Sequence, residues 1–259
     1  MKNRFSLLSS FFAYLPQSFI QIIERSAGMA LGKGIAAEAD SKSNEVALCL
    51  NFFERGTPLT VFDIGANNGD WTDAFLKARK DCQIILFEPQ SRLYRNLVSK
   101  YKFKSQIKIV KNAVGSKKED LILYSNSVGS GLASLIQRDL SHFGIPFGAQ
   151  ELVSVIDLDS FCQENAMWPD IIKLDIEGYE LEALRGAYSV LKRTKVCQFE
   201  FGGCNIDSRT YFKDFFNFFK EIDFKIFRMK PKGLQEISNY AEYHETFSPT
   251  NYLALNIQK

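Results

Sequence analysis

Acidic, amide and glycine residues follow two neighbouring apolar segments in the first half of this chain. The first segment ends in Asp63-Ile-Gly-Ala-Asn-Asn-Gly69, and the second, Ile84 to Phe87, ends in Glu88. When a strand, a tight turn, a helix and a second strand follow one another, the second acid lies beside the first turn. A carboxylate in that position can accept hydrogen bonds from both hydroxyls of a ribose. The spacing therefore predicts a pocket for a nucleoside.

The composition of the first turn narrows the choice of cofactor. Gly65 and Gly69 permit the positive backbone angles and the close approach that such a turn needs. Asn67 stands where a dehydrogenase fingerprint has its middle glycine. Asp63 would repel a pyrophosphate but attract the positively charged amino-acid end of S-adenosylmethionine. We therefore expect S-adenosylmethionine as the cofactor, with these four residues and Glu88 around it.

Further polar residues follow the third and fourth predicted strands. Asn112 and Ala113 come after the third strand, where they would border the adenine. Asp175 and Glu177 come after the fourth strand, at the switch point where reacting groups meet in a doubly wound sheet. They are expected to hold the cationic end of the cofactor or to orient the acceptor. The alternative for Glu177 and for Glu180 is to complement a helix N-terminus.

Alternating strand-like and helix-like segments must position these residues. The strand-like segments are near-continuous apolar runs, which are typical of strands covered on both faces. They lie at residues 59–64, 84–87, 107–110, 170–174, 196–201, 224–228 and 252–257, with helices at 70–80, 93–101, 159–165, 180–191 and 211–221. A turn at 230–233 precedes a last loop. The pattern predicts an α/β fold with a doubly wound, mostly parallel seven-stranded sheet.

An interruption separates the third and fourth strands of this pattern. An extra strand is expected at 120–124, and strand character resumes at 151–158. The residues between them, 125–150, are rich in serine, glycine and asparagine. Loops of this length inside a compact domain are usually functional. We therefore expect residues 125–150 to form a lid or an acceptor-binding loop.

The N-terminal part differs from the rest of the chain. We expect a helical extension over residues 1–55 and the main domain over 56–259. Apolar residues recur at helical spacing between Phe5 and Ile23, but Pro16 and two glutamines interrupt them, which argues against a spanning helix or a signal peptide. A one-sided helix or helix pair is favoured, packing on the domain, on a second subunit or on a membrane surface.

Composition excludes several classes of protein. The 32 Lys and Arg nearly balance the 30 Asp and Glu, so no field suited to nucleic acid is expected, and we predict no nucleic-acid partner. The 5 cysteines are far apart without a CxxC pair, and there are 2 histidines. No metal site and no disulfide framework are expected, and a cytoplasmic protein, with peripheral membrane contact as one option, is the simpler interpretation.

Five motifs in order give the chain a resemblance to a known family. They are VFDIGANNGDWT at 61–72, ILFEPQSRLYRNL at 85–97, IVKNAVG at 109–115, SVIDLDSF at 154–161 and IIKLDIEGYELEALRGA at 171–187. In these motifs the chain resembles the FkbM family of S-adenosylmethionine-dependent methyltransferases. The resemblance implies a class I methyltransferase fold, which is Rossmann-like, and methyl transfer to a hydroxyl, often of a sugar or a polyketide. It also implies cofactor-site roles for Asp63, Gly65, Glu88, Asn112, Asp175 and Glu177.

In-line methyl transfer chiefly requires alignment of the reacting atoms, but a sugar hydroxyl must also lose its proton. The candidate bases are Asp175, Glu200 at the end of the fifth strand, and the histidines His142 and His244. His244 lies in the segment 240–247, whose aromatic residues could stack on a sugar.

Two other functions share the glycine turn and the ribose acid. One is a nucleotide-dependent dehydrogenase or epimerase that uses NAD, although Asp63 and the absent middle glycine argue against it. The other is a non-catalytic binding protein that kept the fold and uses the N-terminal helix as its interaction surface.

Overall fold

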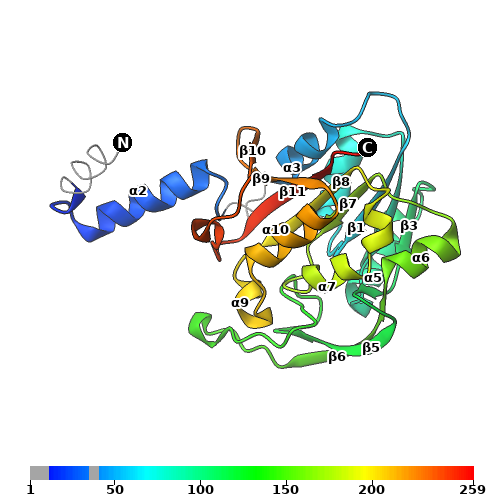
Figure 1. Ribbon diagram of the computed structural model, residues 1–259. Coiled ribbons are helices and arrows are strands. Elements are labelled where there is room, and N and C mark those ends of the chain that lie inside the picture. Colours follow the sequence, from blue (N-terminus) through cyan, green and yellow to red (C-terminus); the bar gives the residue numbers. More distant parts are fainter. Residues whose placement is uncertain (1–11, 35–40) are drawn as a thin grey trace.

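A central sheet organises the protein, whose computed structural model describes residues 12–34 and 41–259 (Figure 1). Within these residues the sheet has eight strands in the order β10-β9-β11-β8-β7-β1-β2-β3. The strands are β1 (Leu59–Ile64), β2 (Cys82–Phe87), β3 (Ile107–Val110), β7 (Ile171–Leu174), β8 (Val196–Phe201), β9 (Phe224–Met229), β10 (Leu234–Glu236) and β11 (Thr250–Asn256). The seven predicted strands are therefore all present, and β10 is an eighth.

Strand direction explains why the predicted site residues can meet. β3, β2, β1, β7 and β8 run parallel, so their carboxyl ends share one edge of the sheet. β11 pairs antiparallel with β8 and with β9. The predicted loop after residue 233 is wrong at its start, because Leu234 pairs with Met229 across the turn and β10 extends the sheet.

Helices cover both faces of the sheet. On one face, α3 (Ser41–Leu50), α4 (Asp70–Ala78) and α5 (Ser91–Tyr101) share a core with Val61, Ile84 and Leu86. On the other, α6 (Leu158–Asn165), α7 (Glu180–Arg185), α8 (Tyr188–Leu191) and α10 (Phe212–Glu221) pack on Phe62, Phe87 and other strand residues. Alternate residues of one strand thus enter different cores, as a sheet buried on both faces requires. The doubly wound prediction is confirmed.

The helix predicted over 180–191 is divided in the structure. α7 ends at Arg185 and α8 begins at Tyr188. A Cβ on Gly186 would lie 2.1 Å from the carbonyl oxygen of Gly115. The chain therefore passes the backbone that follows β4 so closely that only glycine fits, and the helix breaks at this crossing.

A second, smaller sheet carries the interrupted region. β4 (Ala113–Val114), β6 (Ala149–Ile156) and β5 (Glu119–Ser125) lie in that order, with β5 and β6 antiparallel. Residues 126–148, which we name the acceptor loop after the role expected from the sequence, join β5 to β6 and contain the short η1 (Ser141–Phe143). The predicted strands on either side of this loop are confirmed.

Two helices in the described N-terminal part have different surroundings. α2 (Gln17–Ala30) has no buried residue and projects from the domain in Figure 1. α3 buries Val46, Leu48 and Cys49 in the sheet core. The part of the predicted apolar pattern from Phe5 to Phe11 lies outside the described residues. Of the helices described, none is long and apolar enough to span a membrane.

Candidate functional site

A cavity of about 490 Å³ lies at the carboxyl ends of β1, β2, β7 and β8. Its size falls in the range of small-molecule and cofactor sites. Residues from the turns after these strands line it, together with residues of α3, the acceptor loop and the segment before β11. It contains eight of the predicted site residues, which are Gly65, Asn67, Glu88, Asn112, Ala113, Asp175, Glu177 and Glu200.

The turn after β1 is fixed to the end of β2. The backbone N–H groups of Gly65 and Ala66 both donate to the Phe87 carbonyl oxygen, at 3.0 and 3.1 Å. The N–H of Asn67 donates to Glu88 Oε2 at 2.9 Å, and that of Gln90 donates to Glu88 Oε1 at 2.9 Å. Glu88 is only 3% exposed, and its carboxylate borders the cavity in the place predicted for a ribose acceptor.

Burial determines the protonation of Glu88. Loss of solvent raises the pKa of Glu88 to about 7, although the N–H groups of Gln90 and Asn67 and the charge of Lys173 act in the opposite direction. A carboxyl group in this state can be ionised by a ligand that donates hydrogen bonds to it.

Asn67 provides a test of whether a polar ligand fits this end of the cavity. Its Oδ1 is buried and has no hydrogen-bond partner among the described residues, although buried polar atoms nearly always have one. The backbone of Asn67 has a φ of 50°, an angle that asparagine tolerates better than most residues. An unpaired oxygen beside Glu88 suits a ligand with hydrogen-bond donors, such as a nucleoside.

Asn112 and Ala113 lie at the third predicted position around the cavity. Ala113 is buried and offers a small apolar wall, which suits the flat face of a base. Asn112 Nδ2 donates to the Ser154 carbonyl oxygen at 3.1 Å. The amide group of Asn112 therefore joins β6 to the central sheet and leaves its oxygen for other contacts.

Lys173 is the buried cation beneath the cavity. Its Nζ donates to the Gly65 carbonyl oxygen at 3.1 Å and lies 3.2 Å from Asp63 Oδ1 and 3.5 Å from Asp175 Oδ2. Burial alone would lower the pKa of Lys173, but the charges of Asp63 and Asp175 raise it above its usual value. Lys173 therefore stays charged and joins the ends of β1 and β7.

The segment after β7 presents two acids to the cavity and keeps a third for itself. Burial would raise the pKa of Asp175, but the charges of Lys173 and Lys42 lower it below its usual value. Glu180 is fully buried and accepts from the N–H groups of Ile176 and Gly178. The alternative role for Glu180, at the start of its helix, is thus the one that the structure supports.

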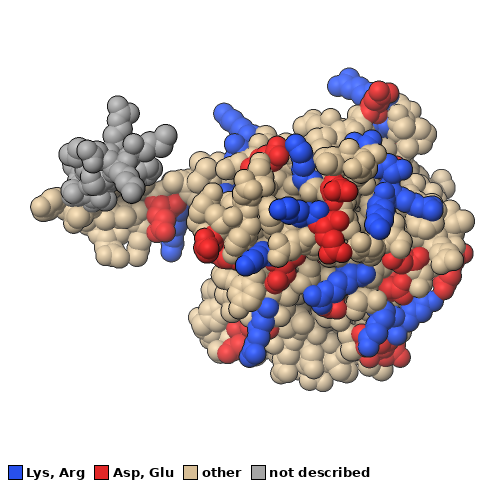
Figure 2. Space-filling model, in the orientation of Figure 1, with Lys and Arg blue, Asp and Glu red and all other residues tan. Residues whose placement is uncertain are grey.

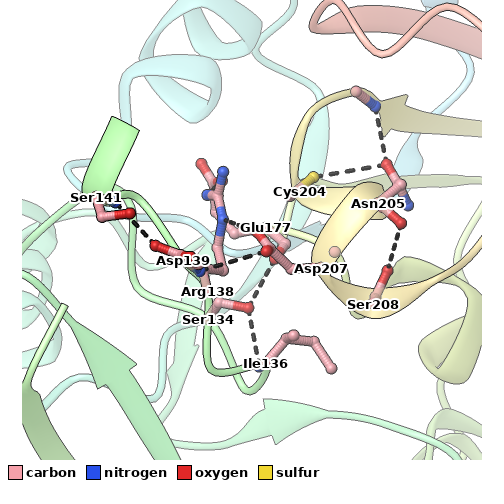
Figure 3. Close-up of polar contacts among 12 residues, drawn as sticks. Ser134, Ile136, Arg138, Asp139, Ser141, Glu177, Cys204, Asn205, Asp207 and Ser208 are labelled. Atoms are coloured by element: carbon pink, nitrogen blue, oxygen red, sulfur yellow. Dashed lines mark hydrogen bonds and ion pairs between the residues drawn. The ribbon is translucent and has the colours of Figure 1, made fainter. Parts of the chain in front are cut away.

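Glu177 connects this segment to the acceptor loop, as Figure 3 shows. Its Oε2 lies 2.6 Å from Arg138 Nη1, and Arg138 Nε lies 3.4 Å from Asp207 Oδ2. Ser134 Oγ also donates to the Glu177 carbonyl oxygen at 2.7 Å. Burial and the charge of Asp175 raise the pKa of Glu177 to about 8 against the opposing charge of Arg138. Arg138 thereby holds the loop against the segment after β7.

The acceptor loop is also tied to the opposite wall of the cavity. Gln90 Nε2 donates to the Ser130 carbonyl oxygen at 3.0 Å. A Cβ on Gly131 would lie 2.9 Å from Asn67 Nδ2. Because its residues contact both the turn after β1 and the segment after β7, the loop crosses the cavity.

The side chains of Glu200 and Lys42 border the cavity. Within the described part of the chain, the carboxyl group of Glu200 makes no hydrogen bond or ion pair. Burial, followed by the charges of Asp175 and Glu177, raises the pKa of Glu200 well above its usual value. The closest charged partner of Lys42 is Glu45, whose Oε1 lies 3.6 Å from the ammonium. Each has unused hydrogen-bonding capacity.

Three predicted site residues lie away from the cavity wall, and these predictions are corrected. Asp63 is fully buried and accepts from Thr72 Oγ1 at 2.7 Å, so it acts on the cavity only through Lys173. Gly69 faces Tyr101, whose hydroxyl would lie 2.4 Å from a Cβ there. His244 is 6% exposed, and its Nδ1 accepts from the Ala241 N–H at 3.0 Å. None of the three faces the cavity.

The remaining histidine and the predicted aromatic residues are also distributed unevenly. His142 is exposed and does not line the cavity. In the segment 240–247, only Phe247 lines the cavity. Tyr240 packs on Phe216 instead. Phe143 of the acceptor loop lines the cavity as well. Two rings from distant segments therefore line the same cavity.

Sequence reasoning assigned no role to Lys42, Lys173 or Arg138. Lys173 lies inside the motif at 171–187. A lysine within an apolar strand is a signal of a buried charge pair. Lys42 and Arg138 offered no comparable signal, because each reaches the cavity from a segment whose packing depends on tertiary contacts.

Charges on the outer surface are mixed. Figure 2 shows Lys and Arg interspersed with Asp and Glu over the visible face of the domain. Within the residues described, no group of three His, Cys, Asp or Glu side chains is arranged to hold a metal ion.

Comparison with known proteins gives a family match. The model of the methyltransferase FkbM domain matches residues 63–226, more than half of the chain. The curated 2-O-methyltransferase NoeI of Sinorhizobium fredii is 24% identical over 163 residues, which cover 59% of this chain and 66% of that protein. The chain thus spans just under two thirds of the length of this relative.

Solved structures similar to this one are more distant in sequence. A putative O-methyltransferase from Klebsiella pneumoniae has a TM-score of 0.47 at 9% identity, covering 97% of this chain and 96% of that one. An rRNA methylase from Streptococcus thermophilus has a TM-score of 0.46 at 9% identity, covering 83% and 95%.

Proposed function

Because the chain belongs to the FkbM methyltransferase family, whose methyl donor is S-adenosylmethionine, we propose that it methylates a hydroxyl group of a sugar or glycan. Membership of this family argues against the alternative of an NAD-dependent dehydrogenase. Transfer to an oxygen atom of a sugar is supported by three side chains that line the cavity, Glu200, Phe143 and Phe247.

The described residues fit the donor, which supplies an electrophilic methyl group on a sulfonium. Glu88 and Asn67 offer acceptors for a ribose, and Ala113 offers an apolar wall for a base. Asp175, whose pKa is held low by Lys173 and Lys42 against its burial, stays ionised and suits an ammonium. These residues bind and align the donor, and alignment is the main requirement of an in-line displacement.

Glu200 carries the proposal of an O-methyltransferase. Its carboxylate lines the cavity, and its burial and neighbouring acids raise its pKa, which makes it a stronger base than an ordinary carboxylate. Asp175 is a weaker base because Lys173 and Lys42 hold its pKa low, and His244 lies off the cavity. In the proposed step the acceptor oxygen bonds to the methyl carbon as the carbon–sulfur bond breaks. The hydroxyl proton moves to a Glu200 oxygen.

Two aromatic side chains in the cavity support a sugar as the acceptor. Phe143 and Phe247 both line the cavity, and aromatic rings present apolar faces on which the C–H face of a sugar can pack. The name of the distant relative, a 2-O-methyltransferase, agrees with an oxygen acceptor. A polyketide hydroxyl is the second acceptor that the family resemblance implies.

The acceptor can be identified by transfer of a labelled methyl group. The purified protein is incubated with labelled S-adenosylmethionine and a panel of glycans, lipid-linked sugars, polyketides and RNA. We expect label on a sugar oxygen. Label on RNA or on carbon would contradict the proposal, and donor binding without transfer to any of the panel would favour the non-catalytic alternative.

The role of Glu200 can be tested by Glu200→Gln. Loss of a general base lowers kcat by about 100- to 10,000-fold, whereas affinity for S-adenosylhomocysteine should stay unchanged. Asp175→Asn is the matched comparison, since it should weaken donor binding more than it lowers kcat. Normal turnover of Glu200→Gln at saturating substrates would exclude Glu200 as the base.

A further inference from the structure

The strongest unassigned feature of the cavity is Lys42. It belongs to α3, which precedes the matched family domain in the sequence. We propose that Lys42 binds the α-carboxylate of the methionine part of S-adenosylmethionine, so that α3 completes the cofactor site. This inference rests on the proposed function and adds a binding residue to it.

α3 is held firmly enough to place a side chain. Glu45, 2% exposed, accepts from Gln198 Nε2 at 2.7 Å and from Asn251 Nδ2 at 2.9 Å. Gln198 Oε1 in turn accepts from Trp71 Nε1 at 3.1 Å. Buried polar networks of this kind fix one arrangement of their members. Lys42 lies one helical turn before Glu45. Its backbone is therefore held in place by the contacts of α3 with β8, β11 and α4.

The order of the strands shows where the amino-acid end of the donor must lie. Glu88 follows β2, and the cavity continues over β1 to Asp175 after β7. With the ribose at Glu88 and the ammonium at Asp175, the donor lies across β1. The α-amino and α-carboxylate groups share one carbon atom. A cation for the carboxylate must therefore lie close to Asp175.

Of the cations that line the cavity in the described residues, Lys42 is the one whose charged group makes no hydrogen bond. Lys173 is taken by Gly65, Asp63 and Asp175. Arg138 is taken by Glu177 and Asp207. Lys42 has only the contact of 3.6 Å to Glu45, and its side chain is 26% exposed.

Charge complementarity points to the same residue. The positive charge of Lys42 acts on both Asp175 and Glu200, where it opposes the effect of burial on their pKa values. The ammonium thus lies within electrostatic reach of the acid assigned to the α-amino group. A zwitterionic amino acid needs one group of each sign, and this part of the cavity provides both.

The test compares two ligands that share the nucleoside but differ in the amino-acid part. S-adenosylhomocysteine carries the α-carboxylate, whereas 5′-methylthioadenosine lacks it. Their affinities for the full chain are measured by calorimetry with the wild type, Lys42→Met and Lys42→Arg. We expect Lys42→Met to weaken S-adenosylhomocysteine by about 10- to 100-fold, as for a lost charge-assisted hydrogen bond. The affinity for 5′-methylthioadenosine should not change, and Lys42→Arg should keep most of the affinity for both.

Other outcomes would overturn the inference in distinguishable ways. Equal loss for the two ligands would mean that Lys42 supports the fold of the site and does not bind the carboxylate. In that case the melting temperature of Lys42→Gln, a variant that keeps a polar side chain, should fall below that of the wild type. Unchanged affinity for S-adenosylhomocysteine with a raised KM for the acceptor would assign Lys42 to the acceptor instead. Failure of the wild type to bind either ligand would remove the proposed function as well.

Discussion

The two ends of the cavity are built in different ways. At the nucleoside end, Asn67, Glu88 and Gln90 come from two consecutive strand ends and are joined by backbone hydrogen bonds. At the end that we propose for the acceptor, Arg138, Glu200 and Phe247 come from segments far apart in sequence and line the cavity. Backbone geometry changes little when side chains are substituted, whereas the side-chain wall changes with each substitution. Under the proposed function, this difference would let one donor site be combined with different acceptor sites.

Gly65 is the point where the two ends join, and its substitution should have the largest effect. A Cβ there would lie 2.0 Å from the Asp175 carbonyl oxygen, so β1 and β7 would have to separate. We expect Gly65→Ala to cost about 2–5 kcal/mol of stability from strain and overpacking and to abolish binding at both ends. Thermal unfolding and calorimetry measure this.

Gly56→Ala is the control for that substitution. Gly56 has a φ of 85°, close to the 76° of Gly65, but a Cβ there would meet nothing within 4 Å. It should cost only about 1–2 kcal/mol, the penalty for a left-handed backbone. Equal losses for the two variants would mean that the close approach to Asp175 is unimportant.

Glu88→Gln should affect the nucleoside end alone. It removes the charge and gives one of the two N–H donors, of Asn67 or Gln90, an amide NH₂ in place of an acceptor. We expect S-adenosylhomocysteine and 5′-methylthioadenosine to weaken equally, by about 10- to 100-fold, because both carry the ribose. Glu151→Gln, whose side chain bonds Ser91 outside the cavity, should change neither affinity. Loss for only one ligand would place Glu88 away from the ribose.

Arg138→Met should affect the acceptor end alone. Without Arg138, Glu177 and Asp207 lose their cation and the acceptor loop loses one attachment. We expect kcat/KM for the acceptor to fall by about 10-fold with no change in affinity for 5′-methylthioadenosine. Arg92→Met is the control, since Arg92 contacts the same loop at Val128 from an exposed position. If the nucleoside affinity fell as much as kcat/KM, the two ends would not be independent.

The smallest expected effect is a pH dependence of nucleoside binding. Burial raises the pKa of Glu88 to about 7, and the ionised form accepts hydroxyl hydrogen bonds better. Binding should therefore lower this pKa and release a proton. The affinity should increase as the pH rises through 7 and decrease as the pH falls below 7. We expect about a fivefold change for 5′-methylthioadenosine between pH 6 and 8. Glu88→Gln should remove it, and a flat wild-type profile would contradict it.

The contrast between the two ends also explains what the sequence could reveal. Glu88 was predictable because spacing within one strand–turn–helix–strand unit fixes its position. The fold was predictable for the same reason, since apolar runs report burial along the chain itself. Arg138 was not, because its partners Glu177 and Asp207 are reached only after the acceptor loop folds back. His244 was assigned wrongly, since nothing in its neighbours shows that its ring is buried beneath Phe212.

The hydrogen bond between Glu45 and Asn251 has a consequence for the order of folding. These residues are 206 positions apart in the sequence. A growing polypeptide on the ribosome can form the turn after β1 early, since β2 follows it closely. α3 can pack on α4 at that stage, but the hydrogen bonds of Glu45 to Gln198 and Asn251 can be completed only after β11 has been synthesised. A nascent chain would therefore form the turn after β1 long before the network that positions Lys42 is complete, and contacts of such long range are expected to form slowly.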